Sequence, residues 1–87
     1  MGDYKNKHLI LFEAGDFVVD HQYNEVGILL MRFNLMDPDD AYPIFAWDIL
    51  WSGSRYSMNG YPRRAPYTEE SLKNMVIEGL LAFYKNN

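Results

Sequence analysis

Cysteine is absent from this chain of 87 residues. Disulfide bonds and zinc sites built on thiolates are therefore excluded, and the fold must rest on packing, on assembly or on both. Long apolar runs are absent too, because none approaches the roughly 20 residues that a membrane span needs. Asp3, Lys5 and Lys7 precede only the short apolar run 9–12, so we expect neither a signal peptide nor contact with a membrane.

The residue patterns typical of enzymes are also missing. The glycines are isolated and fit neither a phosphate loop nor a dinucleotide fingerprint, and no serine stands in a nucleophile elbow. His8 and His21, the only histidines, are not at metal-ligand spacing. The acidic turn Asp37–Asp40 lacks the glycine and the distant glutamate of an EF-hand loop, so we interpret it as a solvated turn. We therefore predict no enzyme activity, no metal and no cofactor.

Positive charge is scarce and unevenly placed. The formal net charge is −4, which argues against general binding to polyanions. Arg55, Arg63 and Arg64 nevertheless lie in a segment between Trp51 and Tyr67 that contains no acid. Removing these three charges from the net −4 leaves −7 on the remaining residues.

Apolar residues, in contrast, are abundant. They make up 48% of the chain, and aromatic residues make up 16%. A chain of this length buries only about 60–65% of its unfolded surface, so its core is thin. The surplus of apolar side chains predicts a surface that is covered by a partner or by a second copy of the chain.

Short β-rich runs separated by turns dominate the first half. Lys7–Phe12 is predicted as a first strand or a lead-in segment, and a Gly15-Asp16 turn starts a strand over residues 17–19. After a polar loop, Val26–Phe33 is apolar on both faces, so we expect this strand to be covered on both sides. Gly27, near its start, is interpreted as the mark of a tight bend.

The middle of the chain continues in extended segments. Tyr42–Trp51 is predicted as a long strand of alternating pattern that tolerates Pro43 at its start. Arg55–Met58 is interpreted as a short strand, Asn59-Gly60 as a hairpin turn, and Tyr61–Pro66 as extended because of its prolines.

The C-terminal residues have the pattern of an amphipathic helix. Thr68 is the predicted N-cap, and Glu69 and Glu70 suit the positive end of a helix dipole. Apolar residues then recur at helical spacing, which predicts a helix over Glu69–Tyr84. Its apolar arc is wider than one stripe, so we expect the helix to contact both the sheet and another chain.

The segment 51–67 mixes arginine with tyrosine and tryptophan. This mixture is typical of protein interfaces and of grooves for single-stranded nucleic acid; a third interpretation is that the arginines only neutralise an acidic body. We favour the protein interface. The candidate residues, taken from this segment and from the predicted helix, are Trp51, Arg55, Tyr56, Tyr61, Arg63, Arg64, Tyr67, Ile77, Leu81 and Tyr84.

The succession of 15–19, 26–30 and 45–47 resembles small SH3-like barrels, in particular short proteins of tailed bacteriophages. The resemblance covers residues 13–51 and implies a structural or accessory role in a phage, with location in the virion or in the cytoplasm of a host cell.

We therefore predict one domain over residues 1–87, mainly β with one C-terminal α-helix. It would be a small SH3-like barrel or a strongly bent antiparallel sheet over 7–66, with the helix over 68–85. The expected function is a non-enzymatic protein-interaction or assembly module that binds a protein partner or forms a homo-oligomer. The alternative is a nucleic-acid-binding module that uses residues 51–67.

Overall fold

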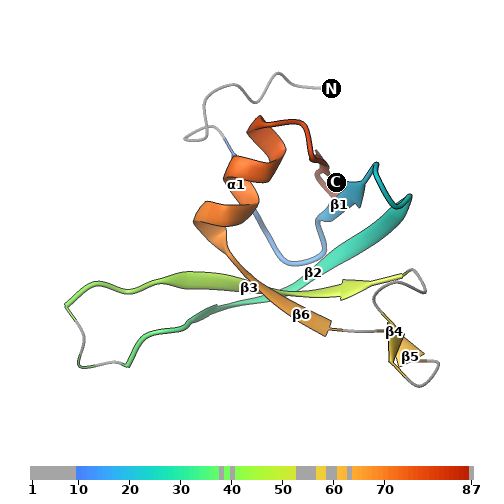
Figure 1. The fold of residues 1–87 in the computed structure, drawn as a ribbon. Helices are drawn as coiled ribbons and strands as arrows, with labels where there is room; N and C mark the ends of the chain where they lie inside the picture. The colour runs from blue at the N-terminus through green and yellow to red at the C-terminus, as the bar shows by residue number, and fades with distance from the viewer. Residues whose placement is uncertain are drawn as a thin grey trace.

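The computed structural model describes residues 10–37, 39, 41–52, 57, 58, 61, 62 and 64–86; for residues 57–65 it describes backbone only. The elements are β1 (Phe17–Asp20), β2 (Glu25–Asn34), β3 (Phe45–Trp51), β4 (Ser57–Met58), β5 (Tyr61–Pro62), β6 (Arg64–Thr68), α1 (Glu69–Ile77) and β7 (Leu81–Tyr84). Five strands form one antiparallel sheet in the order β6-β3-β2-β1-β7, and α1 lies across one of its faces (Figure 1). The predicted mainly-β fold with one helix is confirmed.

Of the two predicted forms, an SH3-like barrel or a strongly bent antiparallel sheet, the barrel is wrong, because the sheet is open. Its two edge strands are β6 and β7, and they do not pair with each other. β7 pairs instead with β1, with Phe17 opposite Tyr84 and Asp20 opposite Leu81. The connection from β6 to β7 runs through α1 over the sheet (Figure 1), so the helix, rather than closure of the sheet, covers the apolar face.

The C-terminal helix is shorter than predicted. It begins as expected, with the Thr68 hydroxyl accepting a hydrogen bond from the Ser71 N–H, but it ends at Ile77. Gly79 has a φ of +81°, and its N–H bonds to the Val76 carbonyl while the Leu80 N–H bonds to the Met75 carbonyl. This pair of bonds is the Schellman motif that terminates helices.

The last residues form a strand, although their apolar pattern fits the spacing of a strand as well as that of a helix. Leu81 and Phe83 are buried, and the residues between and after them are more exposed, which is the alternation of a strand. The same apolar residues also fit helical spacing, and the prediction followed that longer pattern across Gly79. A glycine at the C′ position was the signal against it.

The other predicted segments agree in part. Residues 10–12 form no strand but a lead-in that places Ile10 and Phe12 in the core. The third strand starts at Phe45 rather than Tyr42, since Asn34 and Ile44 close the loop before it. β4 and β5 pair as expected; the predicted Asn59-Gly60 turn, like residues 7–9 and 53–56, lies outside the described residues.

A β-bulge interrupts the alternation of β2. Leu29 stands opposite Ile49, but Met31 stands opposite Asp48, so Leu30 is an extra residue in the ladder. Beyond the bulge, Arg32 lies opposite Trp47 and reaches the helix residue Glu69. Arg32 therefore faces the helix side together with Leu29, whereas simple alternation groups it with Ile28.

The core lies between α1 and the inner face of the sheet, the face that α1 covers. Its buried residues come from the lead-in, the sheet and the helix, and they are Ile10, Phe12, Val18, Leu29, Trp47, Ile49, Trp51, Leu72, Val76, Leu81 and Phe83. Gly27 lies within β2 and not at a bend. A Cβ there would come within 2.7 Å of the Ile49 Cγ2 and 3.1 Å of the Trp51 ring, so this glycine makes room for a large core residue.

Candidate protein interface

The outer face of the sheet, opposite α1, carries two apolar rows. In the first row Tyr84, Phe17, Ile28 and Leu50 follow one another across β7, β1, β2 and β3. The second row is formed in the same way by Ala82, Val19, Val26 and Ser52. We call these eight residues the outer rows; none of them is charged.

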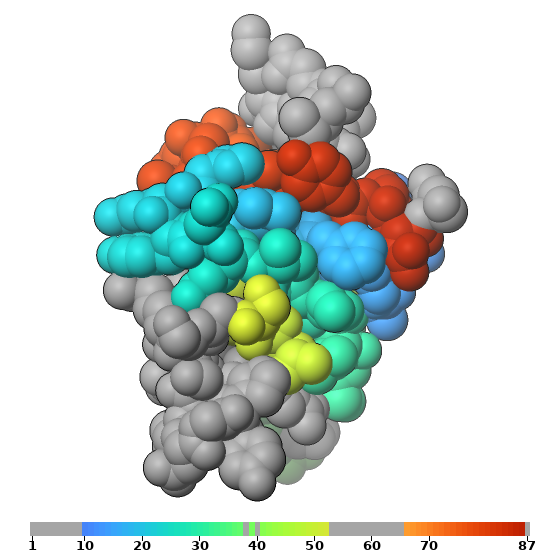
Figure 2. Space-filling model, turned by 90° about the vertical axis from the view of Figure 1, so that its right-hand side faces the viewer, coloured from blue at the N-terminus to red at the C-terminus, as the bar shows by residue number. Residues whose placement is uncertain are grey.

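The outer rows are open to solvent along much of their length. Tyr84 is 41% exposed and Val26 37%, and Phe17, Ile28 and Leu50 are only partly buried. Figure 2 looks onto this side, where β7, β1, β2 and the end of β3 lie side by side with no described element over them. Among the described residues only the inner face of β2 is packed, so the expectation that β2 is covered on both sides stays a prediction for its outer face.

A shallow hollow lies at the β3 end of the rows. It has a volume of about 280 Å³ and is lined by Val26, Ile28, Leu50, Trp51 and Ser52. Tyr84 lies at the opposite end of the first row, on edge strand β7. The face thus has an exposed aromatic side chain at one end and an apolar hollow at the other.

The predicted candidate residues lie in different parts of the fold. Arg55, Tyr56, Tyr61, Arg63 and Arg64 have side chains outside the described residues, although Tyr61 and Arg64 belong to β5 and β6. 

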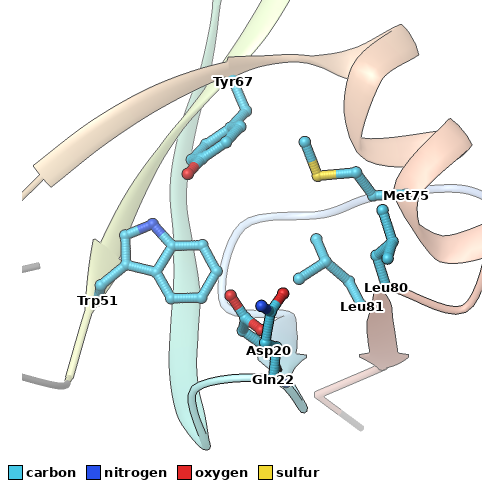
Figure 3. Close-up of a pocket in the computed structure, with 7 residues that line it drawn as sticks. All are labelled: Asp20, Gln22, Trp51, Tyr67, Met75, Leu80 and Leu81. Atoms are coloured by element: carbon cyan, nitrogen blue, oxygen red, sulfur yellow. Dashed lines mark hydrogen bonds between the residues drawn. The ribbon is translucent and has the colours of Figure 1, made fainter. Parts of the chain in front are cut away.

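Trp51, Tyr67 and Leu81 come together on the inner side, around a cavity between sheet and helix (Figure 3). Trp51 and Leu81 are core residues, so in this fold neither offers an exposed surface. Ile77 packs partly buried against the core, and among the candidates with described side chains only Tyr84 is exposed, at 41%.

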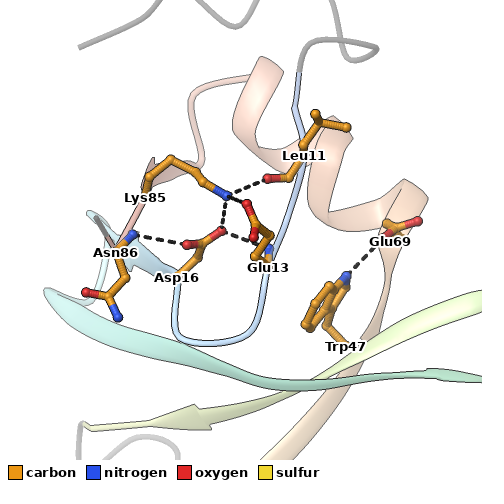
Figure 4. A network of polar contacts seen from close by, with 7 residues as sticks. All are labelled: Leu11, Glu13, Asp16, Trp47, Glu69, Lys85 and Asn86. Atoms are coloured by element: carbon orange, nitrogen blue, oxygen red, sulfur yellow. Dashed lines mark hydrogen bonds and ion pairs between the residues drawn. The ribbon is translucent and has the colours of Figure 1, made fainter.

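A polar cluster anchors the end of β7 beside Tyr84. The Lys85 ammonium donates to the Leu11 carbonyl at 3.0 Å and to carboxylate oxygens of Glu13 and Asp16 at 2.8 Å each (Figure 4). The Asn86 N–H donates to the other Asp16 oxygen at 3.0 Å. These bonds tie the C-terminal strand to the turn before β1 and so fix the position of Tyr84.

Ionisation of this cluster is coupled to folding. Burial opposes the charged form of Asp16, but hydrogen bonds from Lys85 and from the Asn86 and Glu13 amides outweigh it, and the Asp16 pKa is lowered from its ordinary 3.8. Burial likewise opposes the charged form of Lys85, while its bonds to Asp16 and Glu13 raise its pKa above the ordinary 10.5. Both groups are therefore charged over the whole neutral range.

A second cluster joins the helix N-terminus to the sheet. The Arg32 guanidinium donates to both carboxylate oxygens of Glu69, at 3.1 Å each, and stacks 3.7 Å from the centre of the Phe45 ring. The Trp47 indole N–H donates to the same carboxylate at 3.0 Å (Figure 4). Burial opposes ionisation of Glu69, but the Arg32 and Trp47 bonds lower its pKa. Each charge in this cluster has a structural partner, so we assign it a role in stability.

Metal-binding side chains do not gather in the described part of the chain. Among those residues, no group of three or more His, Cys, Asp or Glu side chains is arranged to hold a metal ion. In the same residues, no helix has the length and apolar character needed to cross a membrane. His8 lies outside the described residues, and His21 is exposed in the β1–β2 turn.

Comparison of the chain with known protein families, with curated proteins and with solved structures finds no match. The class of the protein therefore rests on its fold alone, a small antiparallel β domain with one covering helix. The resemblance to SH3-like phage proteins stays a prediction.

Sequence reasoning did not single out Phe17, Ile28 and Leu50 as an interface. The available signal was the apolar character of both faces of residues 26–33. That pattern was interpreted as a strand covered on both sides, and among the described residues one of the two faces is left open.

Proposed function

We propose that this chain is a protein-interaction and assembly module that pairs with a second copy of itself through the outer rows. The observation that carries the proposal is the run of four uncharged apolar residues, Tyr84, Phe17, Ile28 and Leu50, across β7, β1, β2 and β3; the ladder continues beyond Leu50 with Arg64 of edge strand β6. An open apolar sheet face gains stability when a second sheet packs on it, at a spacing of about 10 Å. Each chain has a net charge of −4, so two copies repel each other least where the surfaces in contact carry no charge.

A second copy fits this face because the face is complementary to itself. Two-fold symmetry brings residue i of one chain onto residue j of the other, and residue j of the first onto residue i of the second. Tyr84 stands at one end of the first row and the hollow beside Leu50 at the other. A two-fold axis near Phe17 and Ile28 therefore seats each Tyr84 ring in the hollow of the partner copy.

Sedimentation equilibrium tests the proposal. We expect a mass of twice the 10.2 kDa of one chain at high micromolar concentration, and dissociation that moderate salt does not promote, since the contact is apolar. Tyr84→Ser is expected to give a monomer. The matched control is Tyr42→Ser, because Tyr42 is 83% exposed but lies in the β2–β3 loop, away from the outer rows. A monomeric wild type, or equal effects of both variants, contradicts the proposal.

Titration with oligonucleotides tests the alternative predicted from the arginine-containing segment. We expect no shift of single-stranded or double-stranded oligonucleotides at low salt, because the residues outside this segment carry a large negative charge. A salt-sensitive complex that is lost when Arg63 and Arg64 are both replaced by Ala favours the nucleic-acid function instead.

A further inference from the structure

The end of the β2–β3 hairpin projects away from the rest of the sheet. β1 pairs with β2 only as far as Phe17, which lies opposite Ile28, and β6 ends at Thr68, opposite Ala46. Among the described residues, the hairpin beyond Ala46 is therefore two strands wide. Figure 1 shows this end extending past α1 and away from β1.

Alternate residues of β2 place an apolar strip on the outer face of this hairpin. The bulge at Leu30 brings Met31 to the outer face, and Phe33 and Leu35 follow at every second position. The Leu35 N–H donates to the Ile44 carbonyl at 2.8 Å, so Ile44 lies beside Leu35 on the other arm of the hairpin. We call Met31, Phe33, Leu35 and Ile44 the outer strip.

The outer strip is open to solvent. Met31 is 52% exposed, Leu35 49% and Ile44 44%, and Phe33 is partly buried. Adjoining apolar side chains that remain this exposed mark a surface for interaction with a partner.

Asn34 fixes the backbone that carries the strip. Its side-chain oxygen accepts hydrogen bonds from the Met36 N–H at 3.0 Å and from the Ile44 N–H at 3.1 Å. One side chain thus joins the two arms of the hairpin next to Leu35. Side chains presented on a fixed backbone lose less conformational entropy when a partner binds.

The dimensions of the outer strip suit a single α-helix. Two strands about 4.8 Å apart form a surface about as wide as a helix of about 10 Å diameter. The strip is about 14 Å long from Met31 to Leu35, close to the about 12 Å between residues i and i+8 of a helix. A second sheet would need further strands beside this end of the hairpin, whereas one helix with an apolar face covers the strip.

Charge decides which helix fits. Residues 34–45 contain three aspartates and no lysine, arginine or histidine, and Asp39 is exposed. A helix with basic residues beside its apolar face therefore complements this end of the molecule.

A second copy of the chain does not offer such a helix. Among the described residues α1 is the only helix, and its first turn carries Glu69 and Glu70. Its apolar residues Leu72 and Val76 are already buried in the core. The complementary helix therefore belongs to a different protein.

We infer that the outer strip binds an amphipathic helix of another protein, with aliphatic residues on one face and lysine or arginine beside them. The aliphatic face packs on Met31, Phe33, Leu35 and Ile44, and the basic residues lie toward Asp39. The outer strip is separate from the outer rows, so this inference does not rest on the proposed self-association.

Nuclear magnetic resonance titration with three blocked helical peptides of about 14 residues tests the inference. The first peptide has leucine on one face and lysine beside it, the second has glutamate in place of lysine, and the third has alanine in place of leucine. With the leucine–lysine peptide we expect saturable shifts of the Met31, Leu35 and Ile44 amides. We expect each of the other peptides to bind at least about tenfold more weakly. Equal binding of either one, saturation confined to residues outside the outer strip, or no saturation overturns the inference.

Two variants with matched controls test the contact itself. Leu35→Ser is expected to weaken binding of the leucine–lysine peptide about tenfold. Leu80→Ser, at a leucine of similar exposure (55%) that follows α1, should leave the affinity unchanged. Asp39→Asn is expected to weaken binding about threefold, and Glu78→Gln, at the exposed end of α1, should not. If each variant has the same effect as its control, the inference is wrong.

Two further measurements separate this inference from the proposed function. Tyr84→Ser is expected to bind the leucine–lysine peptide as the wild type does, whether or not it changes the mass of the protein in solution. Loss of self-association in Leu35→Ser would mean that a second copy covers the outer strip, and it would overturn the inference.

Discussion

The two faces of the central sheet carry similar side chains but have different surroundings. The inner face is covered by α1 and the lead-in, and Leu29 and Ile49 there are fully buried. The outer face carries Ile28 and Leu50 on the same two strands, and no described element covers them. Identical residue types therefore serve folding on one face and, on our account, association on the other.

A matched pair of leucines gives the largest expected difference between the faces. Leu29→Ala removes a fully buried side chain and is expected to cost about 3 kcal/mol of unfolding free energy, through lost burial and a residual cavity. Leu50→Ala, on the adjacent strand but the outer face, is expected to cost about 1 kcal/mol or less. Urea denaturation in a Tyr84→Ser background measures both without a contribution from association. Equal costs would remove the distinction between the faces.

Loss of the Asp16 charge should have the next largest effect. Asp16→Asn breaks the buried ion pair with Lys85 that holds β7 in place, and we expect a loss of about 2 kcal/mol. Glu13→Gln is the control, because the Glu13 side chain is 74% exposed and surface ion pairs contribute at most about 1 kcal/mol. If the control costs as much as Asp16→Asn, the buried pair is not the anchor of β7.

The pKa shifts of Asp16, Glu69 and Lys85 predict how the stability of the fold depends on pH. The lowered pKa values of Asp16 and Glu69 mean that their contributions are complete above their ordinary values of 3.8 and 4.5 and are lost as pH falls through the folded values. Lys85, with its raised pKa, contributes below 10.5 and loses its contribution at more alkaline pH. Thermal unfolding measured across this pH range gives the melting temperature as a function of pH. We expect the melting temperature of Asp16→Asn to fall less steeply on acidification than that of the wild type. An unchanged fall would contradict the contribution assigned to the Asp16 carboxylate.

Gly79→Ala should have the smallest of these effects. No atom lies within 4 Å of a Cβ at this position, so the whole penalty comes from the φ of +81°, and we expect a loss of about 1 kcal/mol. Glu78→Ala, at an ordinary helical φ of −76°, should change stability by less than about 0.5 kcal/mol. A more stable Gly79→Ala variant would mean that the helix continues past this residue.

Local patterns predicted most of the elements. The turn at Gly15, the strand after it, the N-cap Thr68 and the start of the helix all follow from residues close in sequence, and the structure contains each of them. These features depend on backbone conformations and capping bonds that a few neighbouring residues determine.

Features that depend on distant contacts were not predictable in the same way. The pairing of β7 with β1 joins residues more than 60 positions apart, and it decides both that the sheet is open and that the C-terminal residues are a strand. The bulge at Leu30 changes which side chains share a face, and no local motif marks it. The outer rows exist only because four strands assemble in one register.

An intermolecular nuclear Overhauser effect in a mixture of labelled and unlabelled chains tests the central claim most directly. Within one chain, three strand spacings of about 4.8 Å separate Tyr84 from Leu50, or about 14 Å, which is too far for an effect between them. We predict contacts from the Tyr84 ring of one copy to the Leu50 and Ile28 methyl groups of the other. No intermolecular effect, or contacts confined to residues outside the outer rows, would contradict the account.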